Sequence, residues 1–384
     1  MTLLDDRLLT ARGIAADWAA EMAEHALAAD RDPDAVRELL HLSCMAYLAT
    51  SPVPEEYVPT PITVDGHRFS GMSTLERVVF IEELAVGDPG LLLGAPGPSL
   101  SGGLLLALGN DDQKKRFYDA LFSRPTWTFF GLTEPDRGSD VGAMTTTLTR
   151  RDGKLLLNGA KRYCGNAARA RLGVVFARTA PGPLGVTSVL VETDQPGFVA
   201  EPIPTLGLRA NQICDIRLTN VEVREENVLG QGLTGTQRGM WGALRALNTF
   251  RPGVGALALG IARAAHAYAL RHRSAPTAWQ RHDLDRTAQR IDATRALLHR
   301  AAVAVDHARE GGYLASAAKA RATHLAEDAT QQALGLFGPG ARYEHPLLDK
   351  LDRDARGVEF MEGTSNIHRL NLFQGLIRGE VGRG

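Results

Sequence analysis

The sequence has little cysteine and none of the short motifs that mark the common hydrolases and phosphotransferases. Its three cysteines, Cys44, Cys164 and Cys214, are too few and too scattered for a disulfide framework, and no CxxC pair exists to hold zinc. HExxH, GxSxG, Walker A and EF-hand patterns are all absent. The sequence therefore predicts no metal site and a reducing, cytoplasmic setting.

Long apolar runs and an excess of either charge are also missing. No uninterrupted apolar run reaches about 18 residues, and the first residues include Asp5 and Asp6 where a secretory signal would be basic. We expect neither export nor a membrane span. With 43 Lys and Arg against 44 Asp and Glu, the net charge is −1, and we predict no nucleic-acid partner.

The sequence does contain enough apolar material for large cores. Its 384 residues are 44% hydrophobic and 23% charged, and the length predicts two or three domains. The charge is uneven: residues 1–124 carry 10 basic and 19 acidic side chains, 125–232 carry 12 and 11, and 233–384 carry 21 and 14. Either the helical surfaces are laced with salt bridges, or the basic last third faces phosphates.

Hydrophobic periodicity divides the chain into three parts. The first part is helical, with helices expected over 34–40, after the Asp32-Pro33 cap, over 73–86 and over 111–122. From about residue 125 the pattern is strand-like, and after residue 232 it is helical again. Strands are expected over 126–133, 144–149, 155–157, 172–177, 186–192, 198–203 and 213–223.

This order predicts an α+β multidomain protein. We expect an N-terminal helical domain over 1–124, a middle antiparallel β-barrel or sandwich over 125–232 and a C-terminal helical bundle over 233–384. A GxGxxG pattern at 230–235 lies at the second boundary, but neither a strand nor an acidic residue follows at the spacing of a dinucleotide site. We interpret it as a glycine-rich domain connection.

Two short stretches carry the chemical information. Residues 131–140, GLTEPDRGSD, form a polar loop after an aromatic strand, and residues 360–369, FMEGTSNIHR, place a carboxylate just before a helix. Taken alone, each is explained by a turn or a helix cap. Together, in an α–β–α chain, they resemble the acyl-CoA dehydrogenase family of flavoproteins. Weaker similarities to that family at 82–88, 161–166 and 353–355 extend the resemblance over nearly the whole length.

The resemblance implies an FAD enzyme. Its fold would be a helical domain, a β domain and a four-helix bundle, with FAD held between the last two and a neighbouring subunit of a homodimer or homotetramer. The reaction would remove two hydrogens from an acyl thioester, Glu362 taking the α proton and flavin N5 accepting the β hydride. A carboxylate suits this role when desolvation raises its pKa from about 4.3 toward neutrality.

The resemblance also implies which residues bind the two ligands. Phe130, Leu132 and Thr133 would line the flavin, and Ser139 would meet an FAD phosphate or the pantetheine arm of the substrate. The other expected contacts are, for the cofactor, Tyr163, Gly165, Thr364 and Asn366, and, for the substrate, Arg251, Gly363 and again Ser139.

The base and one flavin contact can be compared with the family pattern directly. Some members carry their base immediately before the arginine that corresponds to Arg251, but here that residue is Phe250, so Glu362 is the one candidate of the two. Gly165 stands where a threonine commonly hydrogen-bonds flavin N5. That bond is therefore absent or is supplied by another group.

The segment 271–280 also departs from the family pattern. It lacks the Phe-Gly pair of the segment that normally contacts the partner subunit's FAD. We expect Arg271 or Arg273, together with Gln280, to substitute for it.

Several alternatives stay open on the sequence. The thioester could hang on CoA or on an acyl carrier protein, as in divergent members that oxidise carrier-bound hydroxy or amino acyl groups, and the electron acceptor could be an electron-transfer flavoprotein or oxygen. A flavin monooxygenase on the same fold has no need of Glu362, and a silent flavin-binding subunit has no need of a base.

Overall fold

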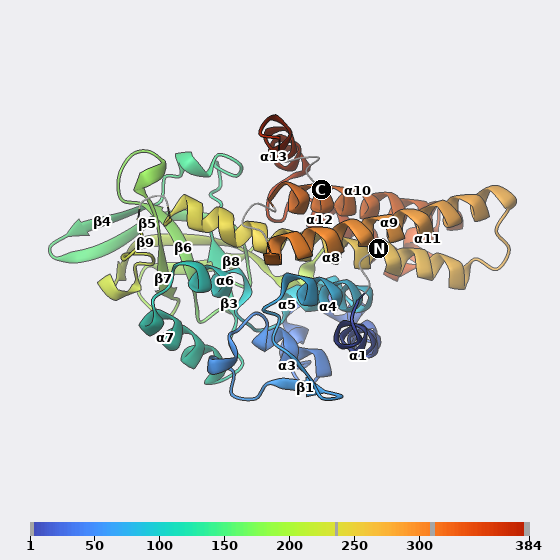
Figure 1. Cartoon of the computed structure of the whole chain (residues 1–384), viewed down its shortest axis with the longest axis horizontal. Helices are drawn as coiled ribbons and strands as arrows, with labels where there is room; N and C mark the ends of the chain where they lie inside the picture. The colour runs from blue at the N-terminus through green and yellow to red at the C-terminus, as the bar shows by residue number, and fades with distance from the viewer. Residues whose placement is uncertain (1–3, 235–236, 308–311, 380–384) are drawn as a thin grey trace.

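The computed structural model describes residues 4–234, 237–307 and 312–379. Figure 1 shows a sheet at one end of the molecule, a long helical bundle at the other, and the N-terminal helices along one side of both. The predicted α+β architecture, with helices first, then a sheet and then a helical bundle, is confirmed.

The N-terminal part consists of helices that begin at recognisable caps. Its elements are α1 Asp6–Ala23, α2 Ala26–Arg31, α3 Ser43–Thr50, α4 Thr74–Gly87, α5 Pro89–Gly94, α6 Ser99–Leu108 and α7 Asp111–Phe122, with a small hairpin of β1 Ile62–Val64 and β2 His67–Phe69. At the start of α4, the Ser73 hydroxyl accepts a hydrogen bond from the backbone N–H of Glu76, and Asn110 forms a capping box with Gln113 on α7. The helices predicted at these two places are confirmed.

The helix predicted over 34–40 is wrong. A 3-10 turn over Pro33–Arg37 takes its place, although Asp32 caps it as predicted, its side chain accepting a hydrogen bond from the Asp34 N–H at 3.0 Å. Within this turn Val36 is the buried side chain. The backbone continues with three-residue hydrogen bonds, from Glu38 to Ala35 and from Leu39 to Val36, and this tight winding buries Val36 and Leu39 in the core without an α-helix.

Seven strands of the middle part form one sheet. They are β3 Thr128–Gly131, β4 Thr147–Arg151, β5 Lys154–Gly165, β6 Leu172–Arg178, β7 Val186–Glu192, β8 Phe198–Pro202 and β9 Ile213–Val223, in the order β3-β6-β4-β5-β9-β8 with β7 also paired to β6. Most neighbours are antiparallel, as predicted, but β6 runs parallel to both β3 and β4. The sheet is therefore mixed, and β6, which is buried at Leu172 through Ala177, has the uniformly apolar character of a central strand covered on both faces.

The C-terminal part is a bundle of long helices. Its elements are α8 Met240–His272, α9 Ala278–His307, α10 Gly312–Phe337, α11 Ala341–Glu344, α12 Pro346–Val358 and α13 Ser365–Ile377. α8 packs against α9, α10 and α12, and also against α4 of the N-terminal part. Its glycines permit this close approach: a β-carbon at Gly255 would lie 2.4 Å from Leu298, and one at Gly260 would lie 2.5 Å from Ala85.

One stretch of α8, Ala246–His272, is long and apolar enough to cross a membrane by length and composition. Most of this stretch is buried inside the structure, among the helices that surround α8. An apolar composition on all sides is also what the central helix of a bundle requires.

A buried lysine joins the three parts of the chain. Lys350 of α12 lies 2.5 Å from Asp88 and 2.6 Å from Asp354, and all three side chains are at most 2% exposed. Asp88 also caps α5 by accepting the Leu91 N–H, and Asp354 accepts the N–H of Leu208, in the loop between β8 and β9, at 2.6 Å. Burial alone would lower the pKa of Lys350, but the two carboxylates outweigh it and raise that pKa.

We expect Lys350→Met to lower the free energy of unfolding by about 3–5 kcal/mol, because it leaves two carboxylates buried without their cation. Chemical unfolding followed by circular dichroism measures this loss. The control is Lys154→Met, which breaks an exposed pair with Glu222 and should change stability by no more than about 0.5 kcal/mol. Equal effects of the two substitutions would contradict the role given to Lys350.

Candidate active site

Glu362 lies in the turn that joins α12 to α13, with its backbone in an unusual conformation. Its φ is +52°, in the left-handed region that non-glycine residues rarely adopt, and Gly363 follows with φ +101°. The side chain is half-buried. Burial raises the pKa of Glu362 to about 7, while the nearby cations of Arg251 and Lys319 act in the opposite direction. The carboxyl group is therefore poised to exchange a proton near neutral pH.

Arg251 of α8 lies directly against this turn. Its buried guanidinium donates from Nε to the carbonyl oxygen of Glu362 at 3.1 Å, and from Nη1 to Oδ1 of Asn248. The structure thus brings together three of the predicted site residues, Arg251, Glu362 and Gly363. Arg251 contacts the backbone of Glu362, so it orients the residue as well as supplying positive charge.

Phe250, the residue before Arg251, points to the N-terminal part. A β-carbon at Gly103 of α6 would lie 2.3 Å from its ring, so the ring lies on the bare backbone of α6. The guanidinium of Arg77 lies over the same ring, 5.5 Å from its centroid. An aromatic side chain therefore occupies the alternative base position that the family resemblance raised in the sequence analysis.

Lys319 of α10 also contacts the Glu362 turn, and the sequence analysis missed it. Its side chain is fully buried, and Nζ donates to the carbonyl oxygens of Glu359 at 2.6 Å and Gly363 at 2.8 Å. The one signal in the sequence is its spacing: Lys319 falls four residues after Ala315 and three before Ala322, on the buried stripe of an alanine-rich helix. A charged residue on such a stripe is a sign of a buried polar contact.

Thr364 and Asn366 open α13. Thr364 is the N-cap residue, but its side chain makes no capping hydrogen bond. The carboxylate of Glu359 takes over that task, accepting the N–H of Ser365 at 2.7 Å and its hydroxyl at 2.8 Å. Asn366 is exposed and accepts a hydrogen bond from Arg369 at 3.4 Å.

The predicted flavin-lining residues of the sheet follow β3. Phe130 and Thr133 are half-buried and Leu132 is buried. The fully buried Lys161 donates to the Leu132 carbonyl at 3.1 Å, and the Arg162 N–H donates to the Thr133 carbonyl at 2.8 Å. Residues of β5 thus hold the backbone of this segment through its carbonyl oxygens. The Thr133 side chain takes no part in these two hydrogen bonds.

Glu134 fastens the loop that comes next. Its buried carboxylate accepts hydrogen bonds from the N–H groups of Thr145 and Thr146 and from Lys161 Nζ, at 2.6–3.0 Å. Burial would raise the pKa of Glu134, but these bonds outweigh it and hold that pKa at about 2. Ser139, at the end of the loop, is exposed.

Tyr163 and Gly165 lie at the irregular end of β5. The pairing of β5 with β9 shifts register between Lys161 and Cys164, and Tyr163 within this bulge has φ +61° and a side chain that is 62% exposed. A β-carbon at Gly165 would lie only 2.7 Å from Oδ1 of Asn211. Asn211, which the sequence analysis did not single out, thus occupies the space that a threonine at 165 would need.

Arg271, Arg273 and Gln280 lie at the far end of the bundle. Arg271 follows Arg251 by 20 residues of one helix, which is about 30 Å, so the structure does not bring these residues to Glu362 within one chain. Gln280 is engaged locally, its side chain accepting the Thr277 N–H at 2.9 Å at the start of α9. Arg273 is half-buried, with its Nε unpaired.

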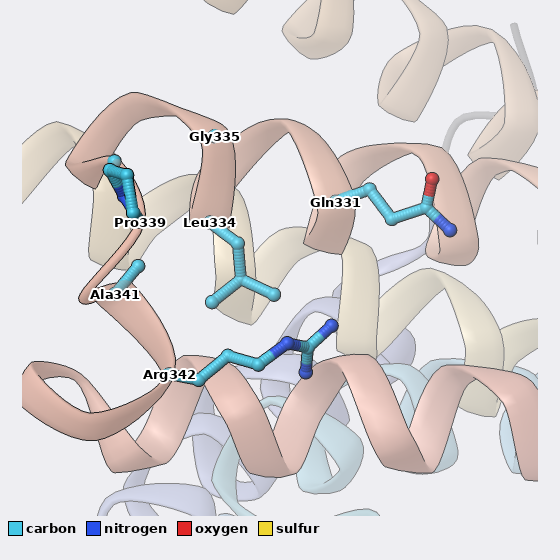
Figure 2. A pocket seen from close by; sticks show the side chains of 7 residues that line it. Gln331, Leu334, Gly335, Pro339, Ala341 and Arg342 are labelled. Atoms are coloured by element: carbon cyan, nitrogen blue, oxygen red, sulfur yellow. The ribbon is translucent and has the colours of Figure 1, made fainter.

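A cavity of about 230 Å³ lies at the same end of the bundle. The end of α8 meets the end of α10 here, because the ring of Tyr268 contacts the ring of Phe337. The cavity is formed by the end of α10 and by the residues that follow it. Figure 2 shows the Arg342 side chain running past Leu334 toward Gln331. The lining residues are Gln331, Leu334, Gly335, Gly338, Pro339, Ala341 and Arg342.

The sequence of the chain is similar to those of acyl-CoA dehydrogenases. Family models for the acyl-CoA dehydrogenase N-terminal, middle and C-terminal domains match residues 9–124, 129–221 and 237–377. The chain is 32% identical over 345 residues to an acyl-CoA dehydrogenase of Bacillus subtilis, an overlap that covers 85% of this chain and 86% of the relative.

Solved structures share the same fold. Butyryl-CoA dehydrogenase from Megasphaera elsdenii superimposes with a TM-score of 0.83 at 26% identity, covering 98% of this chain and 100% of that one. PigA, solved with FAD and proline, superimposes with a TM-score of 0.83 at 21% identity, covering 98% and 99%. The second likeness supports the fold alone.

The close approach of Asn211 to position 165 has a testable consequence. We expect Gly165→Ala to lower the free energy of unfolding by about 1–2 kcal/mol, because the added β-carbon displaces a buried carboxamide. In an Asn211→Ala background the same substitution should cost much less, so the two changes should be strongly coupled when measured by a double-mutant cycle. Additive effects would show that the two positions do not compete for space.

Proposed function

The chain belongs to the acyl-CoA dehydrogenase family, and from this we propose that it is an FAD-dependent dehydrogenase that oxidises an acyl thioester, with Glu362 as the base. The observation that carries this proposal is the place of the Glu362 carboxyl group, in a turn held by the buried cations of Arg251 and Lys319, where burial raises its pKa to about 7. A general base works best when its pKa lies near the operating pH. A glutamate that only caps a helix or faces solvent would have no need of such a shift.

The residues present fit FAD. Tyr163, in a bulge of β5 with φ +61°, has a side chain that is 62% exposed, with the Arg162 guanidinium 5.3 Å from its ring centroid, and an exposed aromatic ring suits contact with a planar ring system. Thr133 has a half-buried hydroxyl on the neighbouring segment, and Phe130 and Leu132 supply apolar surface beside it. These four residues would hold the flavin, with Gly165, Thr364 and Asn366 beside them. When bound, FAD supplies the hydride acceptor that no side chain can provide.

The chain's own residues perform the proton chemistry. Glu362 removes the α proton of the thioester and holds it, and Arg251 fixes the Glu362 backbone through its carbonyl. Arg251 and Gly363 border the acyl group, and Ser139, exposed on its loop, meets the pantetheine arm or a cofactor phosphate. Both CoA and the prosthetic group of a carrier protein end in this arm, so the proposed substrate class is an acyl thioester of either.

The two ends of the bundle support a site shared between subunits. Arg271 lies about 30 Å along α8 from Arg251, which contacts Glu362. Arg273, Gln280 and the cavity of Figure 2 lie at the same end of the bundle as Arg271. These residues would serve the cofactor of a neighbouring copy, as the family resemblance of segment 271–280 implies. A homodimer or homotetramer is the assembly that allows this.

We expect Glu362→Gln to retain the flavin spectrum but to lose reduction of the flavin by thioester, by a factor of about 10²–10⁴. The measurement is anaerobic bleaching of the flavin on addition of acyl-CoA or of acyl groups loaded on a carrier protein. Glu201→Gln, an exposed glutamate of β8, is the matched control and should react as the unmodified protein does.

The same assay separates the alternatives. Bleaching by one thioester and not the other identifies the carrier of the acyl group. Reduction that needs NAD(P)H, with oxygen consumed, indicates a monooxygenase, and a protein that binds no flavin indicates a silent subunit; either result contradicts the proposal.

The rate of flavin reduction should rise with pH through about 7 and then level off. Glu362 can accept a proton only when ionised, and its pKa is raised to about 7, so the active form is lost as the pH falls through that value. Stopped-flow measurement between pH 5 and 9 tests this. A midpoint near 4.5 would place the base in solvent instead.

A further inference from the structure

We propose that Lys319 is a positioning residue for Glu362: its ammonium group binds the two carbonyl oxygens that bracket the Glu362 turn and so holds the carboxylate in its reactive place. This inference rests on the proposed function, because it assigns Lys319 a task in the same proton transfer. It adds a residue that lies outside the two stretches, 131–140 and 360–369, that carry the chemical information of the sequence.

The geometry of the clamp is specific. Nζ of Lys319 reaches the carbonyl oxygens of Glu359 at 2.6 Å and Gly363 at 2.8 Å, one on each side of Glu362. The Glu359 carboxylate is a third partner at 3.9 Å. A single buried cation thus gathers both ends of a five-residue turn.

A second contact from the same helix completes the clamp. Thr323, four residues after Lys319 on α10, donates its hydroxyl to the Glu359 carboxylate at 2.9 Å, and this carboxylate in turn binds the first N–H of α13. Residues four apart on a helix share one face. The start of α13 and the turn before it are therefore both fastened to one face of α10.

The turn needs such a clamp because its backbone is strained. A non-glycine residue with φ near +50° costs on the order of 1 kcal/mol and persists only when its surroundings enforce it. Arg251 holds the Glu362 carbonyl from α8, while Lys319 holds the flanking carbonyls from α10. Without Lys319, the carbonyls of Glu359 and Gly363 would lose the buried ammonium group from which both accept a hydrogen bond.

The charges around Glu362 come from four elements. The charges of Arg251 on α8 and Lys319 on α10 act on Glu362 itself, while Glu359, directly after α12, and His368 of α13 interact with Lys319. His368 is fully buried, and burial lowers its pKa to about 4, so it is neutral at pH 7. Burial also lowers the pKa of Lys319, to about 8. Its cation opposes the upward shift of the Glu362 pKa, so its removal should raise that pKa further.

The test compares Lys319→Met with the unmodified protein by two measurements. The first is hydrogen exchange of the peptide 359–365, which reports the order of the turn without any turnover. The second is the pH midpoint of flavin reduction by acyl-CoA. We expect faster exchange in this peptide alone, a rate at least 10-fold lower, and a midpoint about one pH unit higher.

Two further variants make the result specific. Thr330→Val removes a buried hydroxyl of the same helix that bonds to Asp352, away from the turn, and should leave both measurements unchanged. Lys319→Arg keeps charge and donors and should recover part of the lost rate. If Lys319→Met does not fold, Lys319→Gln, which keeps one donor but loses the charge, is read by the same two measurements.

Unchanged exchange and an unchanged midpoint in Lys319→Met would overturn the inference. A lower rate of flavin reduction, with hydrogen exchange of 359–365 and the pH midpoint both unchanged, would also overturn it. A purely structural defect would lower the rate in this way without moving the midpoint. Failure of the proposed function looks different: Glu362→Gln would then stay active, while the exchange of 359–365 would still respond to Lys319.

Discussion

The arrangement of the three parts of this chain depends on one buried positive charge. Lys350 lies between two carboxylates, of which Asp88 starts α5 and Asp354 holds the loop that follows β8. A buried ammonium is stable only where opposite charge and acceptors surround it. Helices, sheet and bundle must therefore meet in this one way for the charge to be satisfied, and Glu362, four residues beyond the end of α12, takes its place from that meeting.

Two sets of contacts link this arrangement of the three parts to the candidate site. On one side, Leu208 is bound to α12 and Asn211, three residues later, packs on Gly165, so the end of β5 is placed relative to the bundle. On the other side, α8 and α10 hold the Glu362 turn between them. Each path consists of buried hydrogen bonds and close packing, which leave little freedom for the reactive groups.

Features set by neighbours in the sequence could be predicted, and features set by distant partners could not. The caps at Ser73 and Asn110 lie within three residues of the groups they bind, so α4 and α7 were evident from the sequence. The parallel pairing of β6 depends on which strands meet in space, and so it was missed. Lys319 was missed for the same reason, because its carbonyl partners lie 40 and 44 residues away.

The candidate site divides in the same way. Glu362 and the loop after β3 were singled out because their residue types form recognisable strings, and Arg251 was singled out with them, whereas Lys319 and Asn211 were not. Asn211 shows why: nothing about an asparagine in a loop indicates that it fills the space beside a particular glycine. The resemblance to a family indicates the residues that we propose to react, and the structure shows the residues that hold them.

The contact between Gly165 and Asn211 also constrains how this protein can change over generations. A lineage that acquires any larger side chain at 165 while Asn211 is in place passes through a crowded intermediate, and one that first shrinks Asn211 leaves a gap beside the bare glycine. Residues 165 and 211 can therefore be substituted readily only when both change together. A hydroxyl-bearing side chain at 165 would therefore require a second, matching change at 211.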